Sequence, residues 1–315
     1  MSYQQLTEGQ RYQISVLLAE GLSHSRIAQR VGIHRSTISR ELRRNRHQGD
    51  YVPAQAHQQT LIRRAKARKY QVDSDTQQLV ELLLSWQWSP EQISAIAKRI
   101  GFPVSHEWIY CYVARDKARG GRLYRQLRQG HKRYRKGRHG KRSPILEARS
   151  IDERPLIVDN RERLGDWEAD TVLGQQGSGV LVTLAERKSR LYLVKRVESK
   201  HADVVRDAVI EMLSPYADHV HSITFDNGGE FAEHKAIAAA LHTEAYFAHP
   251  YSSWERGLNE NFNGLLRQYI PKGTDLRQVT DDEIEQVQIK LNLRPRKCLE
   301  FRQPAVVFEE LRQAA

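Results

Sequence analysis

The chain has 315 residues, of which 39% are hydrophobic, and carries a formal net charge of +12 at neutral pH. This length allows two or three compact modules with ordinary cores. No segment approaches the roughly 18 apolar residues of a spanning helix, and the N-terminus shows no secretory signal pattern, so we expect a soluble protein. Two distant cysteines, Cys111 and Cys298, cannot form a zinc site alone and agree with a reducing, cytoplasmic location.

The charge is distributed unevenly along the chain. Residues 1–150 hold 29 Lys/Arg and 11 Asp/Glu, a net of +18, whereas residues 151–315 hold 21 and 27, a net of −6. The run 115–142 has 13 basic residues and a single acid, Asp116. A solvated linker would account for this run. Its interleaved tyrosines and its position between basic helical regions favour contact with nucleic acid instead.

The first 60 residues have the spacing of a helix-turn-helix domain. Thr7 and Gln10 form a capping box before a first helix, a second helix follows Ser23, and Gly32 ends it. Ile38 and Leu42 give a third helix an apolar stripe. We predict that the outward residues of this helix bind DNA in the major groove: Arg35, Ser36, Ser39, Arg40 and Arg43. A three-helix bundle with a solvated basic face is the alternative.

Residues 70–114 partly repeat this pattern. Ser89 and Gln92 form another capping box, Gly101 ends that helix, and Ser105 caps a last one. The outward residues, including His106 and Glu107, are less basic than those of the first module. We therefore predict a second helix-turn-helix-like domain and leave open whether it contacts DNA or serves packing or dimerisation. A basic linker is expected over 115–150.

The second half, residues 151–315, reads as strands followed by helices. Strands are expected at 165–173, 179–186, 191–197, 222–225 and 244–248, and helices at 202–213, 231–241, 254–269 and 281–293. This order predicts an α/β domain with a mixed sheet covered by helices.

Acidic residues occur at distinctive places in this order. Asp166, Glu168 and Asp170 share one face of the first strand, Asp226 ends the fourth strand, and Glu260 lies in the long helix. Clustered carboxylates become tolerable when a divalent cation neutralises them, and oxygen ligands favour Mg²⁺ or Mn²⁺. Two such ions about 4 Å apart can activate an attacking oxygen and stabilise a leaving one. From the residues alone, metal catalysis and a sugar- or metabolite-binding domain both remain open.

Four segments together resemble the DDE transposases of the bacterial insertion-sequence-thirty family, whose catalytic domain is similar to retroviral integrase and ribonuclease H. The match covers nearly the whole chain. The segments are Ser36-Thr37-Ile38-Ser39-Arg40-Glu41-Leu42, Gly165-Asp166-Trp167-Glu168-Ala169-Asp170, Phe225-Asp226-Asn227-Gly228-Gly229-Glu230-Phe231 and Asn259-Glu260-Asn261-Phe262-Asn263-Gly264-Leu265-Leu266-Arg267.

The resemblance implies a ribonuclease H-like sheet and a set of site residues. Asp170, rather than Asp166 or Glu168, would join Asp226 and Glu260 as catalytic residues and ligands of two Mg²⁺ (or Mn²⁺) ions. Arg267 and Lys272 would hold DNA phosphate.

The roles of several neighbouring polar residues stay open. Asn259, Asn261 and Asn263 would cap backbone or touch DNA, and His249 would orient a phosphate or pack. The cluster Arg294-Pro295-Arg296-Lys297 would contact the DNA backbone or end a helix.

The resemblance also implies a reaction. The protein would bind the terminal inverted repeats of a mobile element, cut each end with water, and join the freed 3′-hydroxyl to target DNA. Holding two ends together calls for a homodimer or a larger synaptic assembly, working on the nucleoid of a bacterial cytoplasm. The alternatives are a site-specific DNA-binding regulator with an inactive integrase-like domain, and a ribonuclease H-like nuclease without strand transfer.

Overall fold

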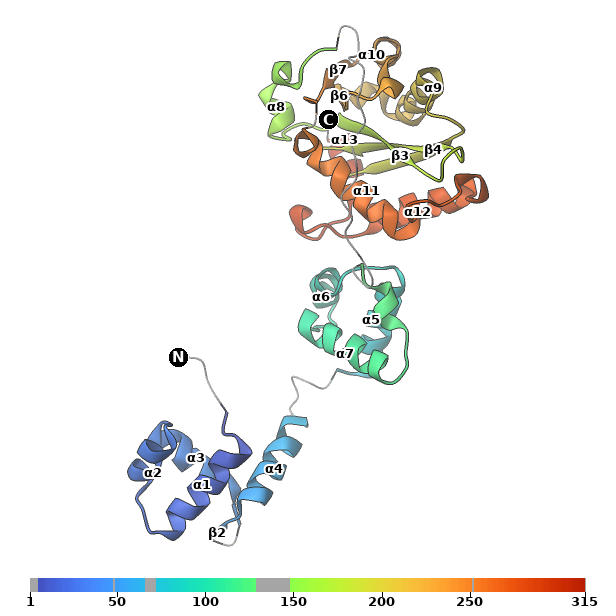
Figure 1. Cartoon of the computed structure of the whole chain (residues 1–315). Helices are drawn as coiled ribbons and strands as arrows, with labels where there is room; N and C mark the ends of the chain where they lie inside the picture. The colour runs from blue at the N-terminus through green and yellow to red at the C-terminus, as the bar shows by residue number, and fades with distance from the viewer. Residues whose placement is uncertain (1–4, 48, 66–71, 129–147, 251, 315) are drawn as a thin grey trace. The chain divides into compact units, whose positions relative to one another are not determined.

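The computed structural model of the chain describes residues 5–47, 49–65, 72–128, 148–250 and 252–314. The chain divides into two compact units, residues 1–77 and residues 78–315 (Figure 1). Among the helices that the structure describes, none is both long and apolar enough to cross a membrane.

The first unit contains the predicted helix-turn-helix. Its elements are α1 (Glu8–Ala19), α2 (His24–Val31), α3 (Arg35–Asn45), β1 (Arg46–His47), β2 (Asp50–Tyr51) and α4 (Pro53–Ala65). The capping box of Thr7 and Gln10 forms, and Gly32 ends α2 at φ +72°, a backbone conformation that glycine adopts without strain. Ile14, Ile27 and Ile38 are fully buried at the centre. The hairpin and α4 were not predicted from the sequence.

A second helical module follows, and all of it except the first four residues of its first helix belongs to the second unit. It comprises α5 (Ser74–Ser85), α6 (Pro90–Arg99), α7 (His106–Ala118) and a 3₁₀ turn at Leu123–Gln126. Ser89 and Gln92 form the expected capping box on α6, and the Ser105 hydroxyl accepts a hydrogen bond from the Trp108 amide at the start of α7. Helix α7 takes in the start of the predicted basic linker, whose residues 129–147 lie outside the described part of the chain.

The turn after the last long helix of the sheet domain contacts this module. The Gln92 side chain donates to the Pro295 carbonyl at 2.7 Å, and the Lys297 ammonium lies 2.7 Å from the Glu91 carboxylate. Arg294 is buried and donates to the Gln87 carbonyl. The Arg294–Lys297 cluster is therefore engaged in packing within the chain.

The centre of the second unit is a five-stranded mixed sheet. Its strands are β3 (Asp166–Leu173), β4 (Val180–Glu186), β5 (Tyr192–Val197), β6 (Ser222–Phe225) and β7 (Glu244–Phe247), in the order β5-β4-β3-β6-β7. The pairs β3–β4 and β4–β5 are antiparallel, whereas β6 and β7 run parallel to β3. This order confirms the predicted mixed sheet of an α/β domain.

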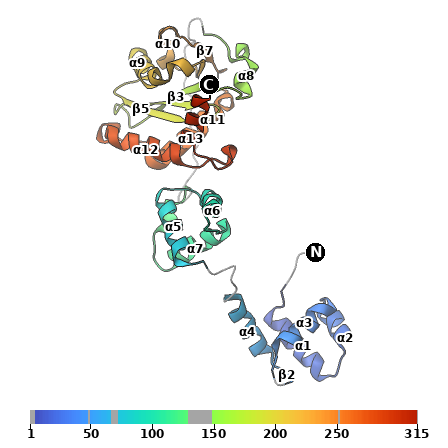
Figure 2. The same ribbon diagram turned by 180° about the vertical axis from the view of Figure 1, so that it is seen from behind.

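Helices cover both faces of the sheet, as Figures 1 and 2 show. The helices of the sheet domain are α8 (Leu156–Asp159), α9 (Ala202–Leu213), α10 (His234–Leu241), α11 (Gly257–Tyr269), α12 (Asp281–Leu293) and α13 (Pro304–Gln313). One face packs Trp167 and Phe225 against α9, α10 and α13. The other packs Val172 and Tyr192 against α11 and α12. On this second face, α11 borders the acidic residues of β3.

Strand β5 lies at an edge of the sheet, and α12 satisfies part of its outward backbone. The Asn292 side chain accepts from the Tyr192 amide and donates to the Tyr192 carbonyl, both at 2.8 Å. One helical turn earlier, Gln288 accepts from the Val194 amide at 2.8 Å. Two amide side chains therefore replace a neighbouring strand at this edge.

Candidate active site

The strand register places Asp170 and Asp226 on neighbouring parallel strands. Asp166 pairs with Ser222 and Glu168 with Thr224, so the same offset carried two residues further sets Asp170 opposite Asp226. Because β3 and β6 run in the same direction, these residues meet at one end of the strand pair. Residues 56 positions apart in the chain thus contribute carboxylates to one place.

A guanidinium group lies between these two carboxylates. Arg256 Nη1 is 3.6 Å from Asp170 Oδ1, and Arg256 Nη2 is 3.6 Å from Asp226 Oδ2. Arg256 Nη1 also donates to the Ala169 carbonyl at 3.1 Å. This residue was not among the site residues predicted from the sequence. Its position four residues before Glu260, one helical turn away, was the signal that could have found it.

The surroundings of Asp170 oppose its ionisation. Burial raises the pKa of Asp170, and repulsion from Asp226 adds to the rise, whereas Arg256 and hydrogen bonds from the Thr171 amide and the Asn263 side chain act against it. The Asn263 amide donates to Asp170 Oδ2 at 2.7 Å and accepts from the Tyr192 hydroxyl at 3.1 Å. The structure gives Asn263 a structural role, because its amide orients the Asp170 carboxylate.

The other two acids of the β3 face have partners of their own. Asp166 accepts from Arg163 at 2.9 Å and from the Ser222 hydroxyl at 2.6 Å. Glu168 forms a buried ion pair with Arg187. Because both are fully engaged and inaccessible, Asp170 is the carboxylate of this face that remains available to a ligand.

Glu260 lies beside this pair without joining it. Its side chain is exposed on α11, between Arg256 and Asn263 on the same row of the helix. Among the described residues, no group of three or more His, Cys, Asp or Glu side chains is gathered closely enough to hold a metal ion. The structure therefore unites Asp170 and Asp226, and places Glu260 one helical turn from Arg256, which contacts both.

The carboxylates of Asp170 and Asp226 are the kind of ligand that binds a divalent cation. Two carboxylates face each other across a positive group, and carboxylate oxygens are the ligands that Mg²⁺ and Mn²⁺ prefer. Repulsion from the Asp226 carboxylate contributes to the raised pKa of Asp170. A bound cation would relieve this repulsion. Asp170 and Asp226 would hold the ion, with Glu260 as the third carboxylate.

The two expected phosphate-binding residues occupy different environments. Arg267 is half-buried, and its guanidinium donates to the Leu173 carbonyl at 2.6 Å and the Pro271 carbonyl at 3.4 Å, at the ends of β3 and α11. Burial lowers the pKa of Arg267. Lys272 is exposed in the turn after α11. In this conformation, Arg267 holds the protein backbone together and Lys272 remains accessible.

The expected DNA-binding residues of α3 line its outer surface. Arg35, Arg40 and Arg43 are exposed, opposite the buried Ile38 and Leu42. The Ser36 hydroxyl lies 2.8 Å from His34 Nδ1 and accepts from Arg40 at 3.4 Å. Ser39 donates to the Arg35 carbonyl at 3.3 Å. Three arginines are thus exposed on the helix for which DNA-binding residues were predicted.

His249 joins two carboxylates at the surface. Its Nδ1 is 2.8 Å from Glu255 and its Nε2 is 2.9 Å from Asp152. Hydrogen bonding to Glu255, followed by the charges of both acids, raises the pKa of His249 above 6.5. In this conformation the ring is therefore a link between two segments of the chain.

We expect this link to stabilise the fold only when His249 is protonated. Because the folded-state pKa is raised, the contribution is complete below pH 6.5, the ordinary value, and is lost as the pH rises through the raised value. NMR titration of the His249 ring should give a pKa above 6.5, and Glu255→Gln should lower it. If the pKa of His249 were the same in the Glu255→Gln protein as in wild type, the assignment would be contradicted.

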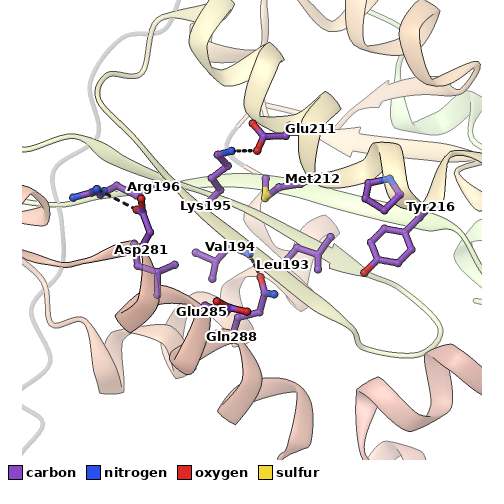
Figure 3. A pocket seen from close by; sticks show the side chains of 12 residues that line it. Leu193, Val194, Lys195, Arg196, Glu211, Met212, Tyr216, Asp281, Glu285 and Gln288 are labelled. Atoms are coloured by element: carbon purple, nitrogen blue, oxygen red, sulfur yellow. Dashed lines mark hydrogen bonds and ion pairs between the residues drawn. The ribbon is translucent and has the colours of Figure 1, made fainter.

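A cavity of about 490 Å³ lies elsewhere, along the β5 edge between α9 and α12 (Figure 3). Four of the charged side chains on its wall form two ion pairs: Lys195 with Glu211, and Arg196 with Asp281 at 3.1 Å. None of the three expected catalytic acids lines it. The carboxylate pair, and not this cavity, is the candidate active site.

Fold and site together define an α/β domain with paired carboxylates at the end of adjacent strands, preceded by helical modules. Residues 2–45 match the family model of a helix-turn-helix domain. The chain is 39% identical to the transposase of insertion sequence element IS4351 from Bacteroides fragilis, over 97% of this chain and 96% of that protein. It is 36% identical to transposase InsI of IS30A from Escherichia coli strain K12, over 96% and 83%.

The chain belongs to the family of insertion-sequence transposases that includes InsI of IS30. Among solved structures it is similar to the catalytic core domain of BIV integrase, with a TM-score of 0.39 and 16% identity, over 47% of this chain and 96% of that domain.

Proposed function

We propose that this protein binds the terminal inverted repeats of its own mobile element, cuts the DNA at both ends and joins them to target DNA. The observation that carries the proposal is the convergence of Asp170 and Asp226 on one cationic group, beside the helix that bears Glu260. Carboxylates held this closely need a positive partner, and phosphodiester chemistry with divalent ions uses such a set.

Each residue has a role in this proposal. Asp170 and Asp226, fixed on the rigid sheet, and Glu260, on the adjoining helix, would hold two Mg²⁺ or Mn²⁺ ions. When bound, such ions supply activation of the attacking oxygen and stabilisation of the leaving oxygen. Asn263 keeps Asp170 oriented through its 2.7 Å hydrogen bond. Rotation of the exposed Glu260 side chain would bring its carboxylate toward the pair.

DNA recognition would fall to the outer face of α3, with Lys272 and Arg267 holding phosphate near the site. Two ends must be held at once, so a homodimer or a larger synaptic assembly is part of the proposal. The contacts of the second helical module with the α12–α13 turn favour its packing role over DNA contact.

A cleavage and joining assay tests the proposal. The full-length protein is incubated with duplexes carrying the element's ends, a supercoiled target plasmid and Mg²⁺ or Mn²⁺. We expect nicks at the end junctions and joined products, both abolished by EDTA. Binding without cutting would favour the DNA-binding regulator, and cutting without joining would favour a general nuclease.

Replacing Arg40 or Arg43 with Ala should weaken end binding by about 1–3 kcal/mol if the side chain reads a base. Arg64→Ala is the matched control, because Arg64 is an exposed arginine on α4 of the same unit. Fluorescence anisotropy with end duplexes and scrambled duplexes measures both affinities. We expect the α3 variants to lose the preference for end DNA and Arg64→Ala to keep it. Preserved preference in Arg40→Ala and Arg43→Ala would exclude base reading by these side chains.

A further inference from the structure

The three acids of the β3 face have arginine partners of two kinds. Asp166 is held by Arg163 at 2.9 Å, and Glu168 is bonded to Arg187. Asp170 and Asp226 are approached by Arg256 at 3.6 Å each, longer than the 2.7–2.9 Å of a charge-assisted hydrogen bond. The first two contacts are hydrogen-bonded ion pairs, whereas Arg256 balances charge without bonding either carboxylate closely.

Arg256 itself is incompletely satisfied where it lies. Its side chain is 11% exposed, and among the described residues its buried Nε has no hydrogen-bond partner. One guanidinium nitrogen donates to the Ala169 carbonyl. A buried guanidinium with an unused donor and two long ionic contacts is held weakly for its degree of burial.

The position of Arg256 in the chain allows its side chain to move away from the two carboxylates. It is the last residue of the 3₁₀ turn Ser253–Arg256 and immediately precedes α11, where no side chain caps the helix. A side chain at a helix entrance can change rotamer without breaking the hydrogen bonds of the helix. Arg256 can therefore move while Glu260 and Asn263 keep their places on α11.

We propose that Arg256 is a positioning residue that occupies the cation position between Asp170 and Asp226 and competes with the divalent ion for it. Without metal, its charge keeps the two carboxylates together and limits their repulsion. Binding of the ion displaces the guanidinium from the position between the two carboxylates. This inference rests on the proposed metal-dependent function of the same carboxylates.

Metal affinity of the DNA-free protein tests the competition directly. We expect Arg256→Gln to bind Mn²⁺ at least about tenfold more tightly than wild type in calorimetry and EPR titrations, because a unit charge at about 4 Å interacts appreciably in a partly desolvated site. The same variant should have a lower Tm in EDTA, and Mn²⁺ should raise its Tm by more than it raises that of wild type.

Two further variants separate competition from a structural effect. Arg163→Gln removes the arginine that pairs with Asp166 of the same strand face, and we expect it to lower the Tm without changing Mn²⁺ affinity. Arg256→Lys keeps the charge but cannot span both carboxylates, so its Mn²⁺ affinity should lie between those of wild type and Arg256→Gln. It serves as the test if Arg256→Gln does not fold.

The possible failures are distinguishable. Unchanged or weaker Mn²⁺ binding in Arg256→Gln, or in Arg256→Lys where the first variant is unfolded, would overturn the competition and leave the metal site intact. Absence of Mn²⁺ binding in wild type, or binding insensitive to Asp226→Asn, would overturn the metal site and the inference together.

Discussion

Asp226→Asn is expected to slow end cleavage by about a thousandfold, because metal catalysis contributes several kcal/mol and each 1.36 kcal/mol changes a rate tenfold. The substitution removes the negative charge but keeps the shape of the side chain. The side-chain oxygen of the asparagine can still accept the 3.0 Å hydrogen bond that Asp226 Oδ1 accepts from the Gly228 amide, so the loop after β6 should remain folded. Single-turnover cleavage of labelled end duplexes measures the rate.

End binding is the internal control for this loss. The α3 surface belongs to the first unit and Asp226 to the second, so affinity for end duplexes should stay within about twofold, less than 0.5 kcal/mol. Glu260→Gln should behave in the same way. Asp207→Asn, which neutralises an exposed acid on α9, should cleave like wild type. Cleavage at a wild-type rate by Asp226→Asn would remove Asp226 from the reaction.

Arg11→Met is expected to destabilise the first unit by about 3–5 kcal/mol, the cost of leaving one member of a buried ion pair unpaired. Arg11 and Glu41 side chains are 3% and 9% exposed, with Nε to Oε1 at 2.8 Å. Arg11 also donates to the Leu6 carbonyl, and the Tyr51 hydroxyl donates to Glu41 at 3.1 Å. The pair therefore joins α1, α3 and the hairpin. Urea unfolding followed by circular dichroism measures the loss.

Two variants calibrate this value. Arg11→Met with Glu41→Leu removes both charges and should recover much of the stability, since the uncompensated carboxylate is the main cost. Arg30→Ala breaks the exposed pair of Arg30 and Glu20, 3.7 Å apart, and should cost no more than about 1 kcal/mol. A loss below about 1 kcal/mol in Arg11→Met would show that the buried pair contributes little.

The strands of the sheet domain were predicted to within one residue at each end, because apolar runs and turn residues mark them clearly. The predicted helix at 281–293 coincides with α12. Helix α4 was not predicted because its sequence lacks a marked apolar stripe. Leu61 and Ile62 are exposed, and Thr60 is joined to α1 through a hydrogen bond from Arg11. A helix attached by polar contacts leaves no hydrophobic period in the sequence.

The candidate site was predictable in its residue types but not in its geometry. Strand alternation placed Asp166, Glu168 and Asp170 on one face, yet gave no reason from the residues to prefer Asp170. That preference follows from Arg163 and Arg187, whose pairing with Asp166 and Glu168 depends on tertiary contacts. The meeting of Asp170 with Asp226 depends on the register of two parallel strands, which no local pattern encodes.

The amide side chains of Asn292 and Gln288 on the β5 edge have a consequence for solubility. An edge strand with open backbone groups is a template for pairing with another chain, and such pairing leads to aggregation. Here the Tyr192 amide and carbonyl and the Val194 amide are already occupied by α12. If several copies were brought close together on neighbouring DNA sites, these occupied backbone groups would therefore disfavour strand pairing between copies at β5.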